Sequence, residues 1–151
     1  MITLIQINQA VNSRIEEALT GSEFSTVEIV AEDLEEPIIR PSIKVAIEDG
    51  TNGKYNSACR EKTLTCRVYF FAKDRHKFKL DNLKMRDLLE NAFLDDLQVM
   101  EGFYIPIENV TSEVSDTILI CSFDLYTIEL LPDTDTSEPM ETLNINLRKE
   151  D

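Results

Sequence analysis

The chain has 151 residues, enough for one ordinary domain with a self-sufficient core and too few for a second folded domain. Its formal net charge of -14 argues against duplex DNA as a specific partner, because a DNA binder needs a basic surface. No apolar run approaches the roughly 20 residues that span a bilayer, and the N-terminus lacks the pattern of a signal peptide. We therefore expect no contact with a membrane and a protein that stays in the compartment where it is made.

The first part of the chain predicts one helix and two strands. Apolar residues recur at helical spacing from 2 to 19, and Gly21 follows as a stop. Strands are expected at 26–30 and 42–48, with an acidic loop at 32–37 between them.

A long polar loop is expected next, at 49–57, because glycine, asparagine and aspartate are concentrated there. Loops of this length in compact domains are often functional or mobile. We therefore treat Asn52, Lys54 and Tyr55 as candidate contacts with other proteins.

The segment 63–93 predicts a strand followed by an amphipathic helix. One face of the strand is apolar, with Leu64, Cys66, Val68, Phe70 and Ala72 at period two. This face is expected to pack on a helical stripe from Met85 to Phe93, with Asp81 as the helix N-cap. The opposite face is half polar and half aromatic, which predicts a partner surface rather than plain solvent exposure.

The remainder predicts a hairpin and a tail. The segment 107–115 is polar enough to be an edge strand, and 117–131 alternates as a long central strand. Residues 132–151 form an acidic C-terminal extension in which Leu143, Ile145 and Leu147 alternate with polar residues, so it is either a flexible tail or an arm that adds to another copy as an edge strand. The predicted fold is α+β (α/β mixed), with a central mixed or antiparallel sheet of about five to six strands flanked by two helices. Its single domain is expected to cover 1–131.

The charge is unevenly distributed along the chain. Residues 1–58 carry four basic and ten acidic side chains, residues 59–98 nine and seven, and residues 99–151 two and twelve, giving -6, +2 and -10. A basic patch on an acidic body suits head-to-tail association between copies. The alternative is a solvated charged face.

The sequence gives little support for catalysis or for a cofactor. It contains no phosphate-binding glycine motif, and its single histidine, His76, stands in a basic turn. Cys59, Cys66 and Cys121 are far apart and form no C-x-x-C pair, so we expect reduced thiols, with Cys59 in a polar loop, and neither a metal nor another cofactor. We therefore expect no enzyme.

Three runs carry a resemblance to a known family: Arg67–Asp74, Met85–Glu90 and Ser122–Tyr126. With the order of elements from about Ile5 to Leu130, they resemble phage tail terminator, or tail completion, proteins. The resemblance implies a structural subunit that forms a ring, usually hexameric, on the head-proximal end of the tail tube. Such a ring ends tube polymerisation and offers a docking surface for the head or a collar.

The resemblance also implies partners and a location. The partners would be other copies of the chain, the tail tube protein, and sheath and head-tail connector proteins, with DNA passing through the lumen without specific binding. The location would be the tail of a phage or phage-tail-like particle, assembled in the host cytoplasm. Alternatives are another head-tail connector subunit, a cytosolic adaptor that binds a peptide along a strand edge, and a small carboxylate enzyme.

The candidate contacts with neighbouring subunits lie on the non-core face of the central strand, in the basic turn after it and in the long loop before it. They are Arg67, Tyr69, Phe71, Lys73, Arg75, Lys77 and Lys79, with Asn52, Lys54 and Tyr55.

Overall fold

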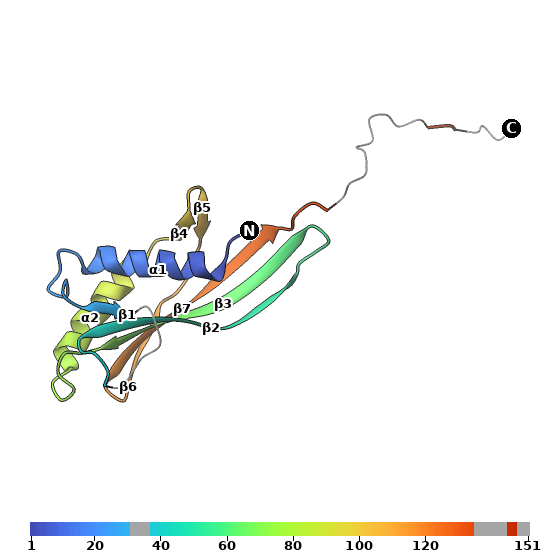
Figure 1. Ribbon diagram of the computed structural model, residues 1–151. Helices are drawn as coiled ribbons and strands as arrows, with labels where there is room; N and C mark the ends of the chain where they lie inside the picture. The colour runs from blue at the N-terminus through green and yellow to red at the C-terminus, as the bar shows by residue number, and fades with distance from the viewer. Residues whose placement is uncertain (31–36, 135–144, 148–151) are drawn as a thin grey trace.

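The computed structural model describes residues 1–30, 37–134 and 145–147. Most of the predicted acidic loop at 32–37, and the predicted C-terminal arm apart from 132–134 and 145–147, lie outside this part of the chain. The elements in chain order are α1 (Leu4–Leu19), β1 (Glu28–Val30), β2 (Ser42–Lys54), β3 (Cys59–Phe71), α2 (Lys79–Ala92), β4 (Leu97–Met100), β5 (Phe103–Ile105), β6 (Thr111–Ser115) and β7 (Ile118–Leu130) (Figure 1).

The main sheet is mixed, and the α+β fold class is confirmed. Its order is β1-β2-β3-β7-β6, with β1 parallel to β2 and every other pair antiparallel. The strands β4 and β5 form a separate two-stranded hairpin. The predicted central strand β7 lies between β3 and β6, and the polar strand β6 lies at the sheet edge as expected, although it begins only at Thr111.

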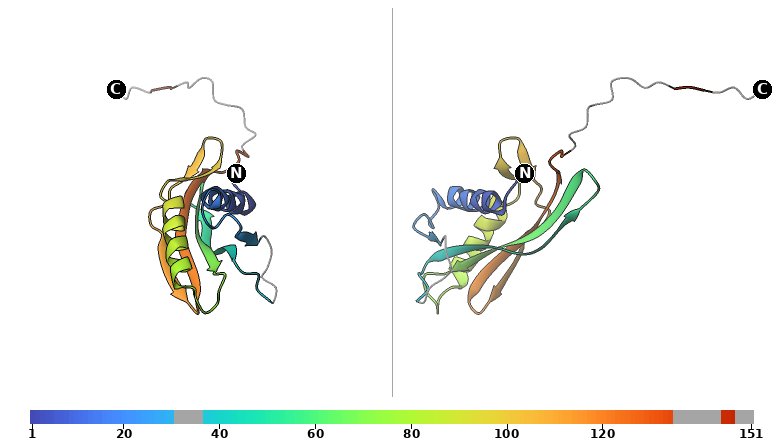
Figure 2. Two further views of the ribbon diagram at one scale, coloured as in Figure 1. Left: turned by 90° about the vertical axis from the view of Figure 1, so that its left-hand side faces the viewer. Right: turned by 45° about the vertical axis from the view of Figure 1, so that its right-hand side comes forward.

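Both helices cover the same face of the sheet (Figure 2). The predicted apolar faces of β3 and β7 point into this layer and are buried. On this side Phe24 packs edge-on against Phe70 at a centroid distance of 5.9 Å, and Phe93 at the end of α2 lies 4.6 Å from Phe123 of β7. The α2 stripe therefore meets β7 directly, and the β3 face fills the same core.

Local signals explain the boundaries of α1. Thr3 and Gln6 form a capping box at its start, and Gly21 after its end has a φ of 81°, a conformation that glycine adopts without steric cost. The start of α2 differs from the prediction. The helix begins at Lys79 after Phe78, with no side-chain cap, so Asp81 lies inside the first turn, where its charge favours the helix dipole.

The predicted loop at 49–57 is wrong. The strand β2 continues through it to Lys54 and pairs with β3, and the register shifts between Glu48 and Gly50. This bulge requires glycine, because a Cβ at Gly50 would lie 2.4 Å from the Thr63 carbonyl oxygen. The turn between the strands is confined to residues 55–58, and Cys59 begins β3 rather than lying in a loop.

Beyond the bulge, β2, β3 and β7 extend as a three-stranded ribbon (Figure 1). The strand β1 pairs with β2 only as far as Lys44, and β6 pairs with β7 only between Ile118 and Ser122. Among the described residues, therefore, no strand pairs with the outer edges of the ribbon. Both edges present backbone donors and acceptors that another strand can use.

Candidate assembly surfaces

The face of the sheet away from the helices is not covered by any described element (Figure 2). Alternating residues of β2, β3, β7 and β6 point to this face, which we call the open face. In the register of the strands it includes Lys44, Ala46, Glu48, Glu61, Thr63, Thr65, Arg67, Tyr69, Thr111, Glu113, Ile120, Ser122, Asp124, Tyr126, Ile128 and Leu130. The open face is the surface that sequence reasoning singled out as too aromatic for simple exposure.

Arg67 and Tyr69 lie together on the open face and share one carboxylate. The Arg67 guanidinium pairs with Glu48 and lies 3.5 Å from an Asp49 oxygen, while the Tyr69 hydroxyl donates to Glu48 at 2.9 Å. The hydrogen bond to Glu48 raises the pKa of Arg67, and partial burial, then Glu48, raises the pKa of Tyr69. The charge of Arg67 is thus largely compensated within one subunit.

Polar pairs also join β3 to β7 across the open face. The Thr65 hydroxyl donates to Asp124 at 2.7 Å, and the Tyr126 hydroxyl donates to Glu61 at 2.9 Å. These cross-strand pairs hold the side chains in one arrangement, so the open face is a preformed surface.

An apolar stripe runs along the ribbon on the same face. It consists of Tyr126, Ile128 and Leu130 at alternate positions of β7, which are 46%, 44% and 77% exposed. Sequence reasoning predicted the long alternating strand at 117–131 but did not propose Tyr126 or Ile128 as contacts. The alternation of β7 could have identified them, because a strand with apolar residues on both faces needs a packing partner on each face. Beside the stripe, a groove of about 900 Å³ lies between Tyr126 and the segment at 106–109.

The predicted basic residues of the turn between β3 and α2 are brought together and exposed. Lys73, Arg75, Lys77 and Lys79 form no ion pair among the described residues. The turn is held by Asp74, whose carboxylate accepts from the backbone N–H groups of His76 at 2.8 Å and Lys77 at 3.3 Å. Donation from His76 lowers the pKa of Asp74. We call Lys73–Lys79 the basic turn.

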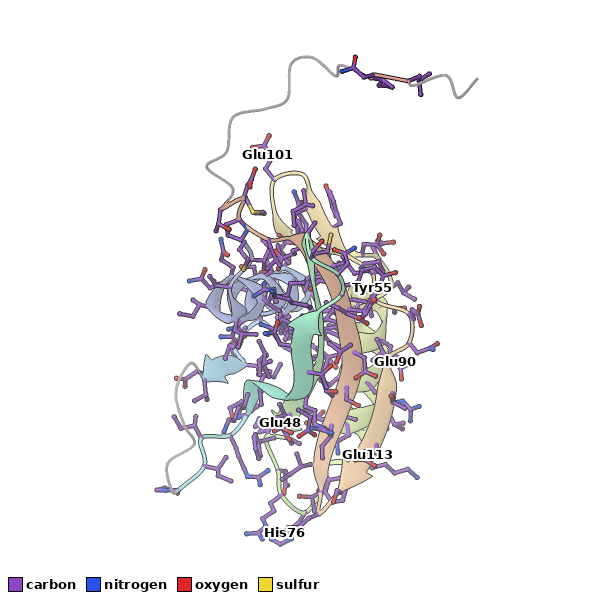
Figure 3. The ribbon with its side chains drawn as sticks, turned by 90° about the vertical axis from the view of Figure 1, so that its right-hand side faces the viewer. Glu48, Tyr55, His76, Glu90, Glu101 and Glu113 are labelled. Carbon is purple, nitrogen blue, oxygen red and sulfur yellow. The ribbon has the colours of Figure 1, made fainter. Side chains whose placement is uncertain are left out.

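The other predicted contacts are separated from the basic turn. Asn52, Lys54 and Tyr55 are exposed at the tip of the ribbon, and β3 separates this tip from the basic turn, which lies at the other end of the strand (Figure 1). In Figure 3, His76 lies at the lower end of the molecule and Tyr55 well above it. Phe71 is only 3% exposed, and the Arg40 guanidinium lies over its ring at 5.9 Å from the centroid. The surface above Phe71 is therefore formed by Arg40.

The other reactive groups among the described residues are the metal-binding side chains and the cysteines. No group of three or more His, Cys, Asp or Glu among them is placed to hold a metal ion. Burial, then the nearby Glu48, raises the pKa of Cys66 to about 12, and burial also raises that of Cys121. Both thiols are core residues and are protonated at neutral pH, and the position of Cys66 on a buried face of β3 agrees with the prediction.

The fold and these surfaces define a small α+β domain with two helices on one side of a mixed sheet and a preformed open face on the other. The chain belongs to the phage tail terminator protein family, whose pattern it matches over residues 6–137. Membership gives it a structural role in a phage tail. No curated protein matches the chain. Among the described residues, no helix is long and apolar enough to cross a membrane.

Proposed function

We propose that this chain is a non-enzymatic subunit of a closed, hexameric ring that caps the tail tube, ends its polymerisation and joins the tube to the head or a collar. The family match supports the tail and the terminator role. The finding that supports a ring is the presence of two unlike surfaces at opposite ends of one subunit. These are the apolar stripe on the ribbon and the basic turn, which lie toward opposite ends of β3 (Figure 1).

Unlike surfaces at opposite ends favour head-to-tail contacts, in which one surface meets a different surface of the next copy. Such contacts close into a ring when the rotation between copies divides a full turn evenly. In this proposal residues 1–131 form the ring domain and 132–151 an arm. The tube protein is the principal partner, with sheath and head-tail connector proteins on the outer and head sides, and DNA passes through the lumen unrecognised. The assembly takes place in the host cytoplasm.

Electron microscopy of the purified full-length chain, alone and after mixing with tube protein, tests the proposal. We expect closed rings with an open lumen, and tubes that are shorter and carry added density at one end. A chain that stays monomeric at high concentration and leaves tube length unchanged would refute the proposal.

The open ribbon edges favour one alternative, an adaptor that binds an extended peptide by strand addition. Electron microscopy distinguishes the terminator from its alternatives. An adaptor would bind peptide as a monomer and form no rings. Another head-tail connector subunit would form rings that do not bind tube ends.

A further inference from the structure

A pocket of about 240 Å³ lies between the first half of α2 and the β6–β7 hairpin. It is mainly apolar and is lined by Phe78, Leu83, Val114 and Leu119, with Lys79 and Arg86 at its rim and Asn82 within it. Leu83 and Val114 are 49% and 54% exposed, so the pocket opens to the surface. It adjoins the basic turn, because Lys79 belongs to both.

Asn82 is a buried polar residue that lines this pocket. It is 3% exposed, and its side-chain N–H donates to the Thr117 carbonyl oxygen at 3.1 Å, which fixes the direction of the amide. Its carbonyl oxygen, Oδ1, is buried and has no partner among the described residues. Leaving a buried acceptor without a hydrogen bond destabilises the fold, and a hydrogen bond from an incoming N–H group would offset this cost.

The strand beside the pocket is also free to accept another strand. β6 is the last strand of the sheet, so among the described residues its outer edge is unpaired. Val114 pairs in register with the buried Leu119 and therefore points to the pocket side of the sheet. An extended segment added along β6 would place every second side chain over the pocket.

The C-terminal segment of the chain has the matching properties. Ile145 and Leu147 are 69% and 90% exposed, and their spacing of two residues puts them on one side of an extended segment. Residues 132–151 hold six acidic and two basic side chains, a net charge of -4, whereas the basic turn holds four basic side chains and Asp74. Apolar pattern and charge are therefore both complementary to the pocket.

The length of the C-terminal extension indicates whether its apolar segment occupies the pocket of its own chain or that of another copy. The 13 residues of β7 span about 40 Å, and the pocket lies at its first end while the extension leaves from its last. From Leu131 to Ile145 a fully extended chain reaches about 50 Å. Folding back onto its own pocket would require almost complete extension, which costs conformational entropy and favours the pocket of another copy.

We propose that the segment around Ile145 and Leu147 of one copy adds as a strand along β6 of the next copy and inserts its apolar side chains into the pocket between α2 and β6. This inference rests on the proposed ring function. It supplies that ring with an arm that links neighbouring subunits.

Cysteine cross-linking tests the inference with full-length chains in which Cys59 is replaced by Ser, leaving only buried native thiols. One chain carries Leu83→Cys in the pocket and the other Leu147→Cys in the arm. The matched control carries Leu94→Cys, an exposed leucine just past the other end of α2. On mild oxidation of mixed chains we expect the Leu83–Leu147 heterodimer to form at least about tenfold faster than the Leu94–Leu147 heterodimer.

Equal rates for the two pairs would overturn the inference. So would a chain carrying both Leu83→Cys and Leu147→Cys that cross-links only within itself. The ring is assessed separately by electron microscopy of the unmodified chain. If rings cap tubes but the Leu83–Leu147 pair shows no preference, the terminator function is supported and the proposed arm is refuted. If the pair is preferred but no rings form, the arm is supported and the ring is refuted.

Discussion

Arg60 and Glu129 lie directly opposite each other on β3 and β7, and they form an ion pair on the side of the ribbon that faces the helices. The Glu129 carboxylate is buried and also accepts the backbone N–H of Ile2 at 2.7 Å. One carboxylate therefore joins the ribbon to the segment that leads into α1.

Replacing this carboxylate tests the joint. We expect Glu129→Gln to lower the free energy of unfolding by about 2 kcal/mol, because the amide keeps an acceptor for Ile2 but loses the charge that faces Arg60. Urea unfolding at pH 7 measures the change. The control Glu101→Gln, in the exposed β4–β5 turn, should change it by less than about 0.5 kcal/mol. Equal effects of the two substitutions would contradict this role for Glu129.

The same carboxylate predicts a pH dependence. Burial raises the pKa of Glu129, but donation from Ile2 and Arg60 outweighs it, so the pKa lies below the ordinary value of 4.5. A carboxyl with a lowered folded-state pKa stabilises the fold above its unfolded-state pKa, and this stabilisation is lost as the pH falls through the folded-state pKa. The difference in unfolding free energy between the natural chain and Glu129→Gln should be constant near neutrality and shrink below about pH 4.5. A difference that grows on acidification would disprove the assignment.

Arg14 of α1 holds the end of α2. Its guanidinium donates to the carbonyl oxygen of Ala92 at 2.9 Å, an acceptor left over by the end of the helix, and to that of Asp96 at 2.8 Å, just before β4. Arg14→Met keeps most of the stem and removes the donors, so we expect a loss of about 1–3 kcal/mol in unfolding free energy. Hydrogen exchange should speed up first around the end of α2. Arg75→Met in the exposed basic turn serves as the control and should have little effect.

The apolar stripe predicts an assembly variant that folds normally. We expect Ile128→Asp to abolish ring formation while changing the unfolding free energy by less than about 1 kcal/mol, because the side chain is already 44% exposed. Met100→Asp, 49% exposed in β4, is the matched control and should still assemble. Analytical ultracentrifugation gives the oligomeric state of both. Normal rings from Ile128→Asp would exclude the stripe from the interface.

The basic turn predicts salt-dependent binding. Its ammonium and guanidinium groups are exposed, so their attraction to an acidic partner surface weakens as the Debye length falls from about 10 Å at 0.1 M salt to about 3 Å at 1 M. We expect Lys77→Glu to reduce association between copies, or with the tube protein, at low salt and to lose its effect at high salt. The same charge change at Lys62 on the ribbon should matter less. A salt-independent effect of Lys77→Glu would show that charge is not its cause.

Much of the fold follows from periodicity in the sequence. The stripe of α1 and the alternation of β7 extend over 16 and 13 residues, long enough for the period to be unambiguous, and β6 is recognisable as an edge by its polarity. The hairpin of β4 and β5 was not predicted, because strands of four and three residues show too little alternation to detect.

The errors have local causes. The glycines at 50 and 53 are typical of a turn, and only pairing with Thr63 across the sheet shows that Gly50 forms a bulge inside a strand. The sequence placed Arg67 and Tyr69 on the non-core face, and their role as contacts stays a prediction. The pairing of the charges on this face was not predicted. Arg67 meets Glu48, 19 residues away, and Arg60 meets Glu129, 69 residues away, so no short-range pattern shows which basic groups are already paired.

Among the residues that the structure describes, the ribbon has two unpaired long edges, one on β2 and one on β7, and these edges limit how growth by edge-to-edge addition can end. If copies join edge to edge, every addition covers two edges and exposes one new edge, so a linear row always keeps a free edge at each end and continues to lengthen. Only a closed cycle reduces the number of free edges to zero. For a member of the phage tail terminator protein family, a subunit whose edge-to-edge growth stops only when a cycle closes agrees with the proposed ring.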